Sequence, residues 1–180
     1  MNTFLLSNNC SFDCSYCPNS WKEGVSITPE ELSGAFFSLR EQGVINGTFI
    51  SSAVNGDSEN VMERIIKAGE MIRKDFGGYI HLKVMPGSSR EQIKRALEVA
   101  NRVSINVETT SQSRMGELSY VKDLKNDIGR RITESSGLQD FTILLLHPLK
   151  ARQIKEILVD GTLPDKDPKT LICRTEENGV

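Results

Sequence analysis

The chain has 180 residues, of which 38% are hydrophobic and 26% are charged, and its formal net charge is −2. This composition is ordinary for one globular domain, and the small negative charge offers no overall attraction to a polyanion such as nucleic acid. No apolar run approaches the ~20 residues that a membrane-spanning helix requires. We therefore predict a single cytoplasmic domain over residues 1–180, with no membrane segment.

Short apolar stretches alternate with helical patterns along the chain. Strands are expected at 3–7, 48–51, 79–85, 103–108 and 141–146, with a sixth candidate at 171–174. Helices are expected at 28–43, 58–76, 88–100 and 151–159, with a less regular one at 118–132. Thr28 and Glu31 predict a capping box for the first helix, and Ser88 with Glu91 predicts one for the third. Strands separated by helices of this length indicate βαβ units and a parallel sheet.

The number of units predicts the architecture. Six units of ~30 residues use up the chain, whereas a complete eight-fold barrel typically takes ~250 residues. We therefore predict an α/β fold, a partial, open parallel βα barrel of five to six units. Apolar and polar residues alternate in 79–85 and 103–108, so one face of each strand is expected to pack on helices and the other to line a polar lumen. The alternative is an open sheet with one face in water, which favours antiparallel strands.

Three of the four cysteines, Cys10, Cys14 and Cys17, lie in the stretch NNCSFDCSYCPN directly after the first predicted strand. A structural zinc site normally has four ligands, and a [4Fe–4S] cluster normally takes four thiolates. The remaining cysteine, Cys173, lies far along the chain in an apolar tetrad, where a buried hydrophobic role is usual. Three thiolates would therefore leave one iron of a [4Fe–4S] cluster open to a ligand that is not protein. Residues 1–9 lack the features of an export signal, which favours reduced, metal-binding thiols over disulfides.

The C-x3-C-x2-C spacing, with Tyr16 before the last cysteine, resembles the cluster loop of the radical S-adenosylmethionine (radical SAM) enzymes. The resemblance implies a radical SAM core domain in which loop 8–24 binds a [4Fe–4S] cluster through Cys10, Cys14 and Cys17. In that family the open iron binds SAM, and one electron splits SAM into methionine and a 5′-deoxyadenosyl radical. The resemblance therefore implies hydrogen abstraction from an unidentified substrate, and an external flavodoxin- or ferredoxin-like electron donor.

Active sites of βα barrels lie at the carboxyl ends of the strands, and the resemblance assigns cofactor contacts to some of the residues found there. Tyr16 matches the aromatic residue whose backbone approaches the adenine of SAM. Ser51, Ser52 and Ala53 fall where relatives often carry a Gly-Gly-Glu segment that contacts the SAM amino group, and this match is one of position only.

Polar residues of the third and fourth predicted strands are further candidates. Asn106 and Glu108 fall where polar residues commonly reach the SAM ribose or carboxylate, the alternative being an ordinary polar pair at a strand end. Lys83 is a candidate to hold the SAM carboxylate or a substrate anion, or else to pair with Glu108 across neighbouring strands. His81 faces the same predicted lumen and is expected to have a packing role. Neither His147 nor the tail 162–180 is assigned a function.

The stretch from Leu5 to about Glu108 is similar, more specifically, to a radical SAM subgroup associated with DNA modification or repair. The segments NNCSFDCSYCPN, ITPEEL, FISSAV, GYIHLKVMPG and SINVE carry this similarity. The subgroup has a further N-terminal sequence and a helix-hairpin-helix segment, both missing here. The chain is thus expected to be a truncated member, with nucleic acid as a partner by analogy only.

Three alternatives to a radical SAM enzyme remain open from the sequence. The chain could be an iron–sulfur electron-transfer or scaffold protein that binds the cluster without SAM chemistry. It could be an inactive, truncated radical SAM fragment. It could also be a zinc-binding structural module whose fourth ligand is not a cysteine.

Overall fold

The structure is a computed structural model that describes residues 2–20, 23–109, 112–129 and 141–145. These residues form a five-stranded sheet in the order β1-β2-β3-β4-β5. The strands are β1 (Asn2–Leu5), β2 (Gly47–Ser51), β3 (Tyr79–Lys83), β4 (Arg102–Val107) and β5 (Phe141–Leu145). Each neighbouring pair is parallel. Spatial order equals chain order and the sheet is not closed, so the predicted α/β fold, a partial βα barrel, is confirmed.

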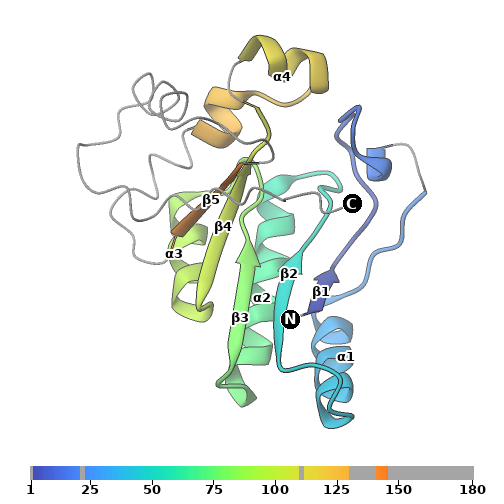
Figure 1. Cartoon of the computed structure of the whole chain (residues 1–180), viewed down its shortest axis with the longest axis vertical. Helices are drawn as coiled ribbons and strands as arrows, with labels where there is room; N and C mark the ends of the chain where they lie inside the picture. Colours follow the sequence, from blue (N-terminus) through green and yellow to red (C-terminus); the bar gives the residue numbers. More distant parts are fainter. Residues whose placement is uncertain (1, 21–22, 110–111, 130–140, 146–180) are drawn as a thin grey trace, which may run out of the picture.

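Helices connect the strands and cover one side of the sheet. They are α1 (Pro29–Glu41), α2 (Ser58–Asp75), α3 (Arg90–Val99) and α4 (Gln112–Leu118), with a 3-10 turn η1 (Pro18–Ser20) and a π-helical segment η2 (Leu124–Gly129). In Figure 1, α2 and α3 lie behind the sheet, and α2 packs against both α1 and α3. The loop that follows β1 and the helix α4 both lie at the edge toward which the strands point (Figure 1). This is the edge where βα barrels carry their sites.

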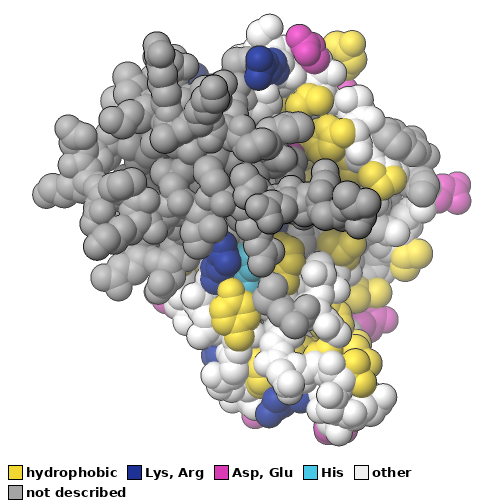
Figure 2. All heavy atoms as spheres, in the orientation of Figure 1, with side chains coloured by type: hydrophobic (Ala, Val, Ile, Leu, Met, Phe, Trp, Pro, Cys, Tyr) yellow, Lys and Arg dark blue, Asp and Glu magenta, His cyan; other side chains and the backbone are white. Residues whose placement is uncertain are grey.

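The described surface carries both signs of charge. In Figure 2, the acidic and basic side chains of the described residues are scattered over the visible face and are not gathered by sign. No helix in the described ranges combines the length and apolar character needed to cross a membrane.

The start of α1 follows the prediction. The Thr28 hydroxyl oxygen accepts a hydrogen bond from the Glu31 backbone N–H at 3.1 Å, and the Glu31 carboxylate accepts one from the Thr28 backbone N–H at 2.7 Å. This reciprocal pair is the capping box, so that prediction is confirmed.

The start of α3 differs from the prediction by one residue. Ser89, not Ser88, is the N-cap, and its capping-box partner is Gln92, not Glu91. Ser89 accepts from the Gln92 N–H at 3.2 Å, and Gln92 accepts from the Ser89 N–H at 3.0 Å. The segment SSREQ satisfies the capping pattern in both registers. The Ser88 hydroxyl instead donates to the Met85 carbonyl at 2.7 Å, which decides between them.

The helix expected at 118–132 is replaced, over its described part, by the end of α4, a turn and η2. The buried hydroxyl of Ser119 accepts hydrogen bonds from the backbone N–H groups of Val121 (3.3 Å) and Lys122 (3.2 Å). A serine side chain that bonds the following backbone in this way competes with the helix and interrupts it. Several predicted features lie outside the described residues: residues 130–132, helix 151–159, strand 171–174, tail 162–180, His147 and Cys173.

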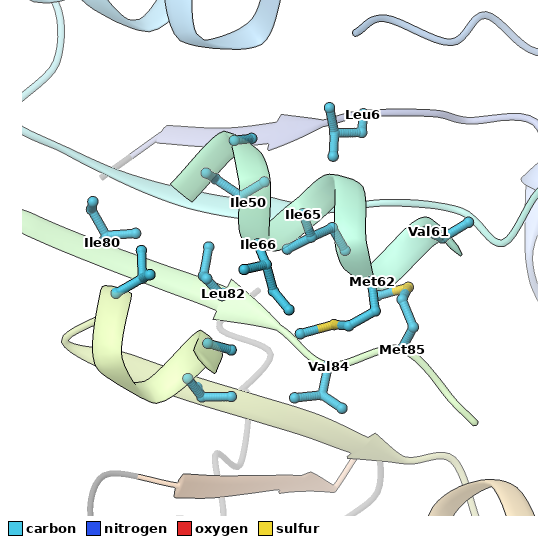
Figure 3. Close-up of a cluster of buried hydrophobic side chains, with 14 of the residues drawn as sticks. Leu6, Ile50, Val61, Met62, Ile65, Ile66, Ile80, Leu82, Val84 and Met85 are labelled. Atoms are coloured by element: carbon cyan, nitrogen blue, oxygen red, sulfur yellow. The ribbon is translucent and has the colours of Figure 1, made fainter. Parts of the chain in front are cut away.

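The hydrophobic core lies between the sheet and α2. The apolar stripe predicted for this helix is buried throughout, at 2% exposure or less for Val61, Ile65, Ala68 and Ile72. In Figure 3, side chains of α2 point toward those of β2 and β3, such as Ile50 and Leu82. Because removal of apolar surface from water is the largest favourable term in folding, this layer holds the strand ends in place.

Truncation of Ile65 to alanine is expected to destabilise the protein by about 2–5 kcal/mol, because the side chain is fully buried and leaves a cavity. Urea denaturation followed by circular dichroism measures the loss. The control is Val44→Ala, where the side chain is 58% exposed and a change within about 0.5 kcal/mol is expected. Equal losses for the two variants would contradict this description of the core.

Candidate functional site

The cysteine loop, residues 8–24, begins just beyond β1 and is tied to the sheet at its base. Leu6 is 1% exposed, and its backbone N–H donates to the Ser51 carbonyl at 3.0 Å. Asn8 joins the two ends of the loop: its N–H donates to the Val25 carbonyl (3.1 Å), and its side-chain oxygen accepts from the Val25 N–H (2.6 Å). A Cβ on Gly24 would lie 2.3 Å from the Asn9 nitrogen, so only glycine permits this close approach.

The three thiols of the loop are free, and they differ in exposure. Cys10 and Cys17 are partly exposed, whereas Cys14 is 4% exposed. The Ser20 hydroxyl lies within hydrogen-bond distance of the carbonyl oxygens of Cys14 (2.9 Å) and Cys17 (2.7 Å). These contacts hold the second half of the loop in a compact turn.

A cavity of about 290 Å³ lies at the carboxyl edge of the sheet, and all three thiol-bearing residues line it. Every other residue that the sequence predicted for cofactor binding also lines this cavity: Tyr16, segment 51–53, Lys83, Asn106 and Glu108. The structure thus brings together residues from the loop after β1, the end of β2, and strands β3 and β4. The parallel arrangement explains why, because it places the carboxyl ends of all strands at one edge.

Polar side chains of β3 and β4 pair across the sheet. The Lys83 ammonium donates a hydrogen bond to the Asn106 side-chain oxygen. Two residues earlier on each strand, the His81 Nε2 lies 2.7 Å from the Ser104 hydroxyl. Alternate residues of a strand face the same side, so these pairs form successive layers of the face that the sequence predicted to be polar.

His81 does not line the cavity, which agrees with the packing role expected for it. It is 5% exposed and its ring stacks on that of Phe49, with centroids 4.4 Å apart. Burial, and then the positive charges of Arg102 and Lys83, lower the pKa of His81 to about 3. The imidazole is therefore neutral at physiological pH.

Lys83 is one of two buried lysines that line the cavity, the other being Lys122. Lys83 is 8% exposed, and burial lowers its pKa to about 7. The negative charge of Glu108 opposes this shift and the positive charge of Lys122 adds to it. The group is thus close to half protonated at neutral pH. The ion pair between Lys83 and Glu108 considered from the sequence is not formed.

Glu108 pairs instead with Lys122, a residue that the sequence analysis did not single out. Their Oε1 and Nζ atoms are 3.6 Å apart, and the side chains are 11% and 7% exposed. The second carboxylate oxygen of Glu108 is buried and has no hydrogen-bond partner among the described residues. An unsatisfied buried oxygen is costly, and this one belongs to a residue that lines the cavity, so it can accept a hydrogen bond from a ligand.

Two aromatic side chains complete this part of the site. The Lys122 ammonium lies 5.2 Å from the centre of the Phe12 ring, which comes from the cysteine loop. Tyr16 is 45% exposed. Burial of the remainder, followed by the negative charge of Glu108, raises the pKa of Tyr16, so its hydroxyl stays protonated. Nothing in the sequence marks Lys122, because it lies within a stretch whose pattern predicts a helix.

A family profile described as the Radical SAM superfamily matches residues 4–136, well over half of the chain. The chain belongs to the radical SAM superfamily. This confirms the family predicted from the cysteine spacing, and the members of this family are enzymes that bind an iron–sulfur cluster and SAM. No curated protein sequence matches the chain.

Solved radical SAM structures share the fold at low sequence identity. The FeFe-hydrogenase maturase HydG from Carboxydothermus hydrogenoformans is 18% identical with a TM-score of 0.64, covering 87% of this chain and 38% of that one. Methylornithine synthase (PylB) is 15% identical with a TM-score of 0.63, covering 79% and 42%. The cobalamin-dependent enzyme OxsB, with aqua-cobalamin and SAM bound, is 15% identical with a TM-score of 0.54, covering 87% and 26%. The chain thus spans less than half the length of each.

The residues present fit a radical SAM cofactor set. Among the described residues, no three metal-binding side chains are close enough together to hold one metal ion. In a cubane cluster each thiolate binds a different iron, so the three sulfurs need not meet at a single point. The three cysteines line one cavity, and that cavity also offers an ammonium group (Lys83) and an unsatisfied carboxylate oxygen (Glu108). SAM carries a carboxylate, an amino group and ribose hydroxyls, which are the complements of these groups.

Proposed function

We propose that this chain is a radical SAM enzyme in which Cys10, Cys14 and Cys17 hold a [4Fe–4S] cluster and the adjoining cavity holds SAM. When bound and reduced, the cluster supplies the electron that splits SAM into methionine and a 5′-deoxyadenosyl radical, which takes a hydrogen atom from a substrate. The observation that carries the proposal is the gathering of the three thiols and all other predicted site residues around one cavity.

Different residues of the cavity are the candidates to bind the different polar groups of SAM. The Lys83 ammonium is the candidate for the carboxylate, because it bonds the neutral Asn106 side chain, whereas Lys122 is already paired with the Glu108 carboxylate. The unsatisfied oxygen of Glu108 is the candidate acceptor for ribose hydroxyls or the amino group. Tyr16 offers its backbone to the adenine, and segment 51–53 offers polar atoms at the end of β2.

A one-electron donor is required by this chemistry, and we propose a flavodoxin- or ferredoxin-like protein in the cytoplasm. Cys10 and Cys17 are partly exposed, so a cluster held by them lies close to the surface. Such exposure suits electron entry, and it is equally compatible with the alternative of an electron-transfer or scaffold protein. The two functions differ in whether SAM is cleaved.

To test the proposal, the protein is reconstituted anaerobically with iron and sulfide, reduced with dithionite and mixed with SAM. We expect 5′-deoxyadenosine and methionine in equal amounts, measured by liquid chromatography with mass spectrometry. A cluster that forms without SAM cleavage would favour an electron-transfer protein, a scaffold or an inactive fragment. Stoichiometric zinc in place of an absorbing cluster would favour a structural zinc module.

The subgroup associated with DNA modification or repair makes nucleic acid the first substrate class to test. This part of the proposal rests on the sequence similarity, since the net charge is −2 and the described residues visible in Figure 2 form no basic patch on that face. Fluorescence anisotropy with single-stranded and duplex oligonucleotides at about 50 mM salt measures the affinity. Absence of binding to both, beside intact SAM cleavage, would exclude nucleic acid without affecting the rest of the proposal.

A further inference from the structure

The part of the loop between Cys10 and Cys14 is held from two sides. On one side Ser11 contacts the segment between β2 and α2. Its N–H donates to the Val54 carbonyl at 2.6 Å, and its hydroxyl oxygen accepts from the Gly56 N–H at 2.7 Å. This half of the loop is therefore attached to the segment between β2 and α2.

On the other side the loop contacts a distant segment, residues 118–122, which we call the docking turn. The Asp13 carboxylate accepts a hydrogen bond from the Ser119 hydroxyl and another, at 3.0 Å, from the Tyr120 backbone N–H. The Ser15 N–H donates to the Leu118 carbonyl at 2.8 Å. These contacts join residues more than 100 positions apart, so they arise only when β1 to β4 are assembled.

The conformation of the docking turn depends on Ser119. This residue is 3% exposed, and its hydroxyl donates to Asp13 while it accepts from the N–H groups of Val121 and Lys122. One buried hydroxyl thus connects the cysteine loop to the backbone of the turn. Loss of Asp13 would leave that hydroxyl donor unpaired in a buried place, which is unfavourable.

The docking turn also reaches the cavity. Its last residue, Lys122, lies over the Phe12 ring of the cysteine loop and pairs with Glu108 at the cavity wall. Asp13 directly precedes Cys14, the most buried of the three thiol residues. A shift of the loop at Asp13 would therefore move the Cys14 side chain first.

We propose that Asp13 is a positioning residue that holds Cys14 at the cavity through its contact with Ser119 in the docking turn. Asp13 does not itself touch a ligand in this role; it acts through Cys14. The contact joins protein atoms only, so one arm of the test uses cluster-free protein and is independent of the proposed function. The arm that concerns cluster retention rests on that function.

The first arm measures how fast each thiol of the cluster-free, reduced protein reacts with a maleimide, by mass spectrometry of cysteine peptides. In Asp13→Ala we expect Cys14 to react about tenfold faster than in the wild type, since the charge-assisted contact that holds the loop beside it is lost. Ser119→Ala should have a similar effect, and the double variant should add little because both remove one contact. Asp13→Asn should fall between the wild type and Asp13→Ala, since its one amide oxygen can accept from the Ser119 hydroxyl or from the Tyr120 N–H but its NH2 group cannot accept from the other.

The control is Glu31→Ala, which removes the capping carboxylate of α1; that carboxylate bonds Thr28 and not the cysteine loop. It should lower the melting temperature and leave Cys14 reactivity unchanged. If Asp13→Ala leaves the reactivity of Cys14 unchanged, or accelerates all cysteines equally together with a fall in melting temperature, the positioning role is wrong. Should Asp13→Ala not fold, the reactivity of Cys14 in Ser119→Ala decides the question by the same criterion.

The second arm measures iron loss from the reconstituted protein to a ferrous chelator. Asp13→Ala is expected to lose iron about tenfold faster than Glu31→Ala, because one of three ligands is less well held. Equal rates would overturn the claim that Asp13 positions a cluster ligand. Failure of the wild-type protein to cleave SAM would refute the proposed function while the thiol reactivities still test Asp13, so the two failures are distinguishable.

Discussion

Replacement of Cys14 by alanine is expected to abolish cluster assembly, so that iron bound after reconstitution falls to background and no 5′-deoxyadenosine forms. The physical reason is the ligand count: three loop thiols leave none to spare, and Cys14 is the one that the fold buries at the cavity. Iron and sulfide analysis together with the visible absorption spectrum measures the effect.

Cys173→Ala is the matched control, because it removes a cysteine that lies far along the chain from the loop. It should retain full iron and full SAM cleavage. If Cys173→Ala loses the cluster, the cluster has four protein ligands and no iron open to SAM. If Cys14→Ala keeps the cluster, the assignment of the loop thiols is wrong.

Replacement of Lys83 by methionine is expected to weaken SAM binding by the reconstituted protein about 10- to 100-fold at pH 6, the range for loss of a hydrogen bond to a charged group. Lys83 has a pKa of about 7, so its ammonium form dominates below that pH. Wild-type affinity should therefore decrease as the pH rises above about 7, whereas the variant should show no such decrease. Equilibrium dialysis under anaerobic conditions measures both.

The stability of the cluster-free protein checks the buried state of Lys83 without SAM. Its pKa is about 7 in the folded chain against an ordinary value of 10.5, so between these values the unfolded chain binds more protons. Stability should therefore rise with pH across this window, by on the order of 5 kcal/mol. The Lys83→Met variant should not show this rise in stability with pH. Glu108 and Lys122, which also face the Lys83 ammonium, are unchanged in that variant.

Lys67→Met is the control for both measurements, since Lys67 forms a surface ion pair with Glu30 and its side chain is 56% exposed. It should leave SAM affinity and the pH dependence of stability unchanged. A Lys83→Met variant that binds SAM as tightly as the wild type at pH 6 would show that Lys83 does not contact the SAM carboxylate.

Local features of the chain were predicted well because they depend on neighbouring residues. Thr28 and Glu31 form the predicted capping box, and the apolar stripe through Ile65 is buried. The errors also have local causes. Two overlapping capping patterns made Ser88 and Ser89 equivalent in the sequence, and the interruption at Ser119 is invisible in a periodic pattern.

The gathering of site residues was predictable because it follows from topology. Once the strands are parallel and separated by helices, their carboxyl ends meet at one edge. The cysteine loop, segment 51–53, Lys83 and Asn106 then have to lie near one another, and they line one cavity. The polar alternation in β3 and β4 by itself places the last two on the same face.

The sequence by itself determined the order of strands and helices, the thiol loop and the family to which they belong, since these depend on spacing and on residues close together in the chain. Only the tertiary structure decided the partners of the charged groups. Glu108 pairs with Lys122, and Asp13 contacts Ser119, across separations of 14 and 106 residues. Such pairs depend on the position that the docking turn takes in the folded protein. No local sequence pattern encodes which distant segments will meet there.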